Sequence, residues 1–183
     1  DRDATKDKNG EWKGLRWEVD IAEAGYKFNM NNVSAAIGLS QIPRIKPTLA
    51  RHRKNAAIFA AAFKNIPYLK PLQYPKGSTP SFWVYTLLTN PHPEHKNWRE
   101  YRDKILAELN AEGIAAGVVH TPNHYYSCFK PDYAELPNTD YFANHQISLP
   151  CGWWLNDHDA RHIAKRFVEM TSKHYKEWQN NNS

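Results

Sequence analysis

The sequence has few cysteines and no long apolar run, and both features narrow the possible functions. Only two of the 183 residues are cysteines, Cys128 and Cys151. Their positions match no metal-ligand spacing and they need not pair, so the expected compartment is the reducing cytoplasm. No stretch approaches the ~20 apolar residues that a membrane-spanning helix needs, so no membrane contact is expected.

Several motifs of common enzyme classes are also missing. The sequence contains no G-x-G-x-x-G, no P-loop, no G-x-S-x-G and no H-E-x-x-H. Most histidines stand singly on expected loops or charged helix faces. We therefore interpret the following as exposed and predict no metal site: His52, His92, His95, His145, His158, His162 and His174.

The composition is that of a globular protein with a basic balance. Hydrophobic residues make up 41% and charged residues 23%, and the formal net charge is +5. The densest basic segment is "RIKPTLARHRK" at 44–54. On a helix its cations spread around much of the circumference, which favours a solvated face over a phosphate-binding stripe. We expect no nucleic-acid partner, because no aromatic residues interleave these cations.

A helix is expected to begin at Asn31 or Asn32, because asparagine is a good N-cap. Pro43 should end or bend it, and Pro47 suits the first position of a second helix that runs to about residue 65. The pattern further predicts a strand at 81–89, a helix at 97–113 stopped by Gly113, a buried strand at 114–120, a short helix at 139–145, a strand at 147–149, and a last helix after an Asn156–Asp159 capping box. The expected class is α+β, with a small sheet covered by helices.

The segment "VVHTPNH" is the first candidate site. His120 ends an apolar run, and Asn123 and His124 follow in a loop that also carries Tyr125 and Tyr126. Aromatic rings beside hydrogen-bonding groups suit a sugar or a base. The composition supports a polar connecting loop equally well.

The segment "GYKFNMNN" at 25–32 is the second candidate site. Lys27 and several asparagines surround the positive end of the expected helix, which can accept a phosphate. The same asparagines could simply cap and turn the chain. Small residues from Ser34 to Gly38 then permit close packing against another helix or subunit.

These blocks together resemble a known family. "AGYKFNMNNVSAAIGLSQI" is similar to the G-Y-N-(aromatic)-R-M motif of the DegT/StrS family, and the likeness continues through "RHRKNAAIFAAAF", "SFWVYTLLT", "LNAEGIAAGVVHTPNH" and "ISLPCGWWLNDHDARHIAKRF". It extends in order from Gly25 to Val168. Family members are pyridoxal-phosphate-dependent aminotransferases of nucleotide-linked keto sugars, with the aspartate-aminotransferase fold (fold type I).

The resemblance implies that this chain is the C-terminal portion of such an enzyme. Residues 1–24 would be a loop resting on a missing large domain, 25–46 a turn and dimer-interface helix, and 47–183 the small α/β domain. The family's Schiff-base lysine would lie upstream, so we expect no catalytic residue in this chain, no covalently bound cofactor and no activity of the chain alone. The complete enzyme would be a homodimer that takes an amino-acid amine donor and a nucleotide-linked sugar.

The resemblance also implies roles for individual residues. Tyr26, Lys27 and Asn29 would contact the cofactor phosphate across the dimer interface, and His120, Asn123 and His124 would line the sugar-nucleotide site. Lys27 and Asn29 depart from the family's usual Asn and Arg. Two other functions stay open: a pyridoxal-phosphate-dependent sugar dehydratase of the same fold, and a non-catalytic binding or regulatory domain.

Overall fold

The computed structural model describes residues 8–9, 25–26, 28, 30–89, 98–132 and 135–181. The chain divides into two compact units, Asp1–Ile42 and Pro43–Ser183. Apart from 8–9, the predicted loop at 1–24 lies outside the described residues, as do His92 and His95. Each unit is described by itself below.

Helix α1 (Asn32–Phe63) begins where the sequence predicts. The Oδ1 atom of Asn31 accepts a hydrogen bond from the Ser34 amide at 2.8 Å, which confirms the asparagine cap. The prediction of two helices is wrong, because α1 continues through both Pro43 and Pro47. Each proline removes one backbone hydrogen bond, at a cost of about 3 kcal/mol, but the bonds on either side keep the helical path.

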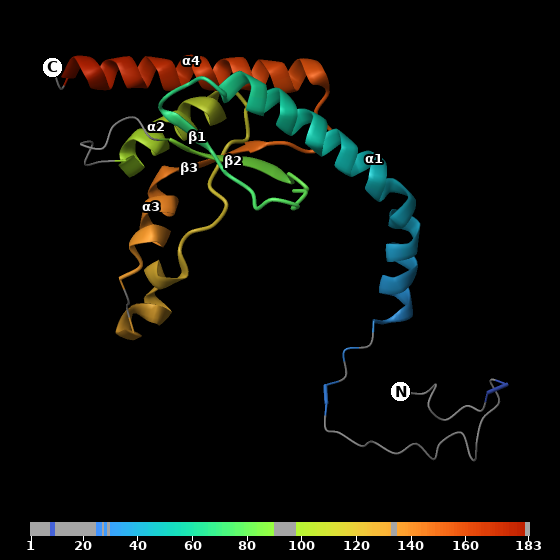
Figure 1. The fold of residues 1–183 in the computed structure, drawn as a ribbon. Coiled ribbons are helices and arrows are strands. Elements are labelled where there is room, and N and C mark those ends of the chain that lie inside the picture. Colours follow the sequence, from blue (N-terminus) through green and yellow to red (C-terminus); the bar gives the residue numbers. More distant parts are fainter. Residues whose placement is uncertain are drawn as a thin grey trace. The chain divides into compact units, whose positions relative to one another are not determined.

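The sheet has three antiparallel strands in the order β1-β2-β3 (Figure 1), which confirms the predicted α+β class. Strand β1 (Leu69–Pro71) pairs with β2 (Val84–Thr89), and β2 pairs with β3 (Gln146–Pro150). The sequence did not predict β1. Strand β2 begins three residues later than predicted, because Phe82 has a φ of 54° and cannot be extended there.

The segment predicted as a buried strand at 114–120 is not a strand. It makes a single bridge, in which Gly117 pairs with Ser148 of β3. Ile114 and Ala116 are buried, whereas Val118 and His120 are exposed. The segment therefore leaves the core after one pair of backbone hydrogen bonds.

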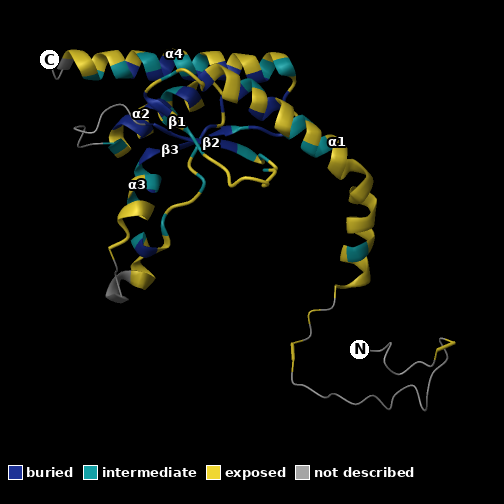
Figure 2. Ribbon diagram, in the orientation of Figure 1, coloured by how far each residue is buried: buried dark blue, intermediate teal, exposed yellow. Residues whose placement is uncertain are grey.

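The described part of the second unit also contains the α-helices α2 (Trp98–Ala111), α3 (Pro137–His145) and α4 (Asp157–Asn181), with two short 3-10 helices, η2 (Asn123–Tyr125) and η3 (Ser127–Asp132). Asn156 Oδ1 caps α4 by accepting the Asp159 amide hydrogen at 2.9 Å, as the capping box predicts. The predicted apolar face of α4 is confirmed and buried (Figure 2); it comprises Ala160, Ile163, Ala164, Phe167, Met170 and Thr171. No helix in the described part of the chain is long and apolar enough to cross a membrane.

Helix α4 also buries a histidine that the sequence placed at the surface. His174 is 9% exposed, and its Nε2 lies 3.0 Å from Glu108 of α2. Because α2 packs along α4, the contact face extends one turn beyond the apolar stripe. The interpretation of His174 as exposed is therefore wrong.

Helix α2 ends in a Schellman motif around Gly113, whose φ is +80°. The Ile114 amide donates to Leu109 and the Gly113 amide donates to Asn110, both at 3.0 Å. A Cβ atom at Gly113 would meet nothing within 4 Å, so only the backbone conformation opposes a side chain there. Glycine is favoured at position 113 because of its positive φ, and not because space is lacking.

We predict that Gly113→Ala lowers the free energy of unfolding by about 1 kcal/mol, because a left-handed conformation is unfavourable for an L-residue. Urea denaturation of the two proteins measures the difference. Gly113→Asn is the control and should lose less, since asparagine tolerates this conformation. Equal losses for alanine and asparagine would contradict the explanation.

Candidate functional site

The segment 117–126 that carries His120 is held against β3 by one buried side chain. Gly117 and Ser148 exchange two backbone hydrogen bonds, of 3.0 and 2.8 Å. Beyond them, Gln146 is 1% exposed; its Oε1 accepts the Val119 amide at 3.0 Å and its Nε2 donates to the His120 carbonyl at 3.3 Å. The glutamine side chain takes the place of a strand neighbour, which explains why the predicted strand does not form.

His124 is anchored to α3 and does not project freely from its loop. It is 9% exposed, and its Nε2 lies 2.8 Å from Asp140 Oδ1. Tyr125 donates its hydroxyl hydrogen to the same oxygen at 2.6 Å. These two hydrogen bonds, with Tyr125 contributing more, hold the pKa of Asp140 below its ordinary value. The hydrogen bonds from His124 and Tyr125 to Asp140 therefore hold the loop against α3.

A small cavity of about 40 Å³ lies beside His120. It has room for about three water molecules, at about 10–15 Å³ each. Its walls come from α2, the loop and α3: Arg99, Arg102, Val118, His120, Thr121, Pro122, Tyr125, Ala143 and Asn144. The structure thus brings His120 next to two arginines that the sequence interpretation did not select.

The two arginines share one carboxylate. Arg102 donates to Asp103 Oδ1 at 2.6 and 2.9 Å and to the Ala143 carbonyl, whereas Arg99 lies 3.7 Å from Asp103 Oδ2. Asp103 balances one of the two positive charges. The wall formed by α2 therefore carries a net positive charge beside His120, which favours an anionic ligand.

His145 adjoins this region and is buried, contrary to the sequence interpretation. It is 3% exposed, and its ring lies between Trp98 and Tyr141, at centroid distances of 4.7 and 4.1 Å. Burial lowers the pKa of His145, a hydrogen bond to the Tyr141 carbonyl opposes this, and the Arg102 charge lowers it further. The imidazole is thus held in its neutral form at neutral pH.

In the first unit, Tyr26 is 89% exposed and its ring stacks on Phe28 at 5.4 Å. Lys27 and Asn29 lie outside the described residues. The first turn of α1 carries no acidic side chain, and the Asn31 cap accepts a hydrogen bond from one of its backbone N–H groups. The positive end of a helix favours a phosphate group, and tyrosine, lysine and asparagine side chains can donate hydrogen bonds to one.

The predicted sugar-site residues have different environments. His120 lines the cavity, Asn123 is exposed beside it in sequence, and His124 is buried against Asp140. Sequence reasoning missed Arg99, Arg102 and Gln146. No local pattern identifies Arg102 as buried, because the neighbouring cations Arg99 and Lys104 on the same helix are exposed and have the same kind of sequence surroundings.

Within the described ranges, no cluster of three or more His, Cys, Asp or Glu residues could hold a metal ion.

Comparisons with known proteins agree on one family. The model of the DegT/DnrJ/EryC1/StrS aminotransferase family matches residues 4–168. A UDP-4-amino-4,6-dideoxy-N-acetyl-beta-L-altrosamine transaminase from Helicobacter pylori is 30% identical over 151 residues, which cover 81% of this chain and 39% of that protein. A transaminase of the same name from Campylobacter jejuni is matched over 41% of its length. The chain therefore spans about two fifths of the length of these relatives.

Solved structures show the same fold. The sugar aminotransferase CalS13 from Micromonospora echinospora has a TM-score of 0.69 and 31% identity, with 83% of this chain and 38% of that chain covered. Spr1654 from Streptococcus pneumoniae, solved in its PLP-form (PLP, pyridoxal phosphate), has a TM-score of 0.71 and 25% identity, with 86% and 40% covered.

We predict that Gln146→Leu makes the Val119 amide exchange with solvent roughly fivefold faster, because a neutral hydrogen bond contributes about 1 kcal/mol. Hydrogen exchange followed by NMR measures the rate. Ser148→Ala on the same strand is the control; it removes a side-chain bond to Thr86 and leaves the backbone bonds to Gly117. Unchanged exchange at Val119 in Gln146→Leu would show that the glutamine does not hold this segment.

Proposed function

Because the chain belongs to the DegT/DnrJ/EryC1/StrS aminotransferase family, we propose that it supplies the C-terminal part of a pyridoxal-phosphate-dependent aminotransferase of nucleotide-linked keto sugars. The observation that carries the proposal is the family match over residues 4–168, with the shared fold of the second unit. The UDP-sugar activity named for the Helicobacter pylori relative supports the substrate class. An amino acid would provide the amine.

The turn at 25–31 would bind the cofactor's phosphate group. Tyr26, Lys27 and Asn29 are the proposed contacts, and the positive end of α1, whose first turn carries no acidic side chain, favours an anion beside them. Pyridoxal phosphate, when bound, supplies the electron sink for amine transfer. This chain's part in that chemistry is to hold and orient the phosphate, and the Schiff-base lysine is proposed to lie outside it.

The residues around His120 would bind the sugar nucleotide. The positive charge shared by Arg99 and Arg102 beside the cavity suits a nucleotide diphosphate. His120 and Asn123 offer exposed hydrogen-bonding groups, while His124 acts through Asp140 to hold the loop. The half-exposed ring of Tyr126 could stack on a base or a sugar.

The first part of α1 is the proposed interface of a homodimer. Its apolar side chains are strongly exposed, with Val33 at 72%, Leu39 at 68% and Ile37 at 59%. Ala36 and Gly38 are small enough for a second helix to approach closely, and exposed apolar surface of this kind often marks a protein–protein contact. We predict that the complete protein is a dimer and that Ile37→Glu makes it monomeric. Sedimentation equilibrium that gives a monomer for the unmodified protein would contradict the interface.

The function is tested with the complete protein, pyridoxal phosphate, glutamate and a UDP-linked keto sugar. We expect a UDP-linked amino sugar by mass spectrometry, with equimolar 2-oxoglutarate. Arg99→Ala should raise KM for the sugar nucleotide with little change in kcat, because the lost interaction binds the substrate equally strongly in the ground state and in the transition state. Lys104→Ala on the same helix is the control; Lys104 pairs with Glu100 and does not line the cavity.

The 183-residue chain alone gives a second control. We expect no amine transfer from it, and no stoichiometric adduct on a single lysine after incubation with pyridoxal phosphate and borohydride reduction. Such an adduct would place the cofactor lysine within this chain. Loss of water from the sugar without amine transfer by the complete protein would identify a dehydratase, and no reaction would favour a binding domain.

A further inference from the structure

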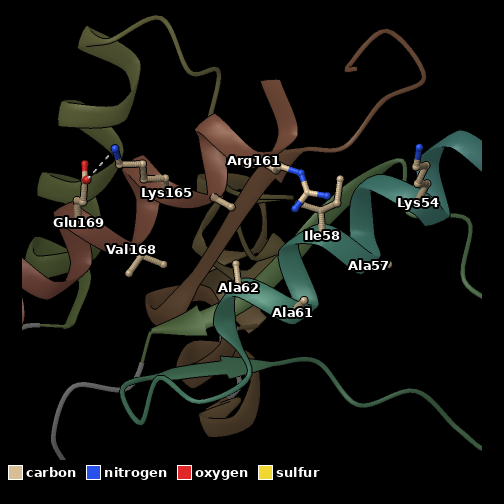
Figure 3. A pocket seen from close by; sticks show the side chains of 10 residues that line it. Lys54, Ala57, Ile58, Ala61, Ala62, Arg161, Lys165, Val168 and Glu169 are labelled. Carbon is tan, nitrogen blue, oxygen red and sulfur yellow. Dashed lines mark ion pairs between the residues drawn. The ribbon is translucent and has the colours of Figure 1, made fainter. Parts of the chain in front are cut away.

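An open groove of about 730 Å³ lies between α1 and α4, away from His120. Its lining side chains are mostly small and aliphatic. In Figure 3, Lys54 and the Lys165–Glu169 pair lie toward its two ends, and Arg161 reaches from α4 toward Ile58. The apolar residues are Ala57, Ile58, Ala61 and Ala62 of α1, with Ala164 and Val168 of α4. All of them belong to the second unit.

The shape of the α1–α4 groove suits a third helix. The exposed alanines at 57, 61 and 62 leave a trough that lets another backbone approach, as helices packed at 8–10 Å require. Ile58 and Val168 are only half buried, so their remaining apolar surface still contacts water. A helix with one apolar face would remove this surface from water.

The edges of the groove favour acidic partners. Its charged residues are Lys54, Arg161, Lys165 and Glu169, three cations and one anion. Lys54 forms an ion pair with Asp157 at 2.8 Å, and Lys165 forms a longer one with Glu169 at 3.8 Å. Arg161 has no ion pair among the described residues, and Figure 3 shows its guanidinium beside Ile58 at the groove. A carboxylate at this edge would complete the charge balance.

We propose that the α1–α4 groove binds an amphipathic helix of the complete enzyme, apolar on its buried face and acidic along the edge next to Arg161. The inference rests on the proposed function, since the helix belongs to the part of that enzyme outside this chain. The matched relatives extend well beyond the region shared with this chain, which covers 39–44% of their length. That remainder is long enough to supply the helix.

A second copy of the groove does not fit as the occupant. Two grooves facing each other would bring like net charges together, with Arg161 opposite Arg161 or Lys165. A small polar ligand fits poorly too, because six of the ten lining residues are alanine, isoleucine or valine. An acidic amphipathic helix satisfies both the apolar and the charged lining residues.

Photo-crosslinking in the complete enzyme tests the occupant. Ala61→p-benzoylphenylalanine should crosslink within the same polypeptide, to a segment with Asp or Glu beside apolar residues. Ala60→p-benzoylphenylalanine is the matched control, since Ala60 is exposed on the same helix but does not line the groove. The yield at position 61 should be several-fold higher. A product of doubled mass, a crosslink to another protein, or equal yields would overturn the proposal.

A charge reversal gives a second readout that needs no crosslink. Arg161→Glu should lower the thermal midpoint of the complete enzyme more than Lys176→Glu, an equal charge change at an exposed position of α4 outside the groove. Equal midpoints would overturn the proposal. Aminotransferase activity without the crosslink would refute only the docked helix, and the crosslink without activity would refute only the proposed function.

Discussion

Four aromatic rings join α1, α4 and the sheet, and the rest of the second unit depends on their packing. Phe63 of α1 lies 5.1 Å from Phe167 of α4, and both Phe59 and Phe63 contact Tyr85 of β2 at 5.4 and 5.9 Å. The three phenylalanines are fully buried. Each contributes about 1.5–3 kcal/mol through burial. A three-stranded sheet this short needs such a cover to be stable.

Helix α1 is buried over only part of its length. Its buried residues are Asn55, Ala56, Phe59 and Phe63, all in its C-terminal half, whereas apolar residues near its start, such as Val33 and Ile37, are exposed. Because α1 and α4 both face the sheet, their outer flanks define the α1–α4 groove. The proposed subunit interface and the proposed helix site therefore lie on different stretches of α1.

The candidate sugar site depends on weaker and more specific contacts. Gln146 holds the backbone of Val119 and His120, and Asp140 holds His124 and Tyr125. Hydrogen bonds of this kind contribute about 1 kcal/mol each, so they position a loop without dominating stability. The cavity at His120 gains its positive charge from α2, whose residues are far from the loop in sequence.

The sequence by itself determined the features that depend on near neighbours. Asn31 and Asn156 cap helices within three residues, Gly113 ends α2 through its own φ, and the face of α4 follows from helical spacing. The order of short motifs also identified the family, with no structure needed. Each of these patterns is complete within a few turns of chain.

Only the tertiary structure decided the features that need distant partners. Gln146 takes the place of a strand neighbour for Val119 and His120, Phe59 and Phe63 of α1 are buried against Tyr85 and Phe167, and α2 and α3 bury Arg102 and His145. None of these contacts has a local pattern, because the competing groups lie tens of residues apart. The intrinsic helix and strand propensities of single residues differ by only about 1 kcal/mol. Long-range packing and hydrogen bonds can outweigh such differences, so they decide the structure at these positions.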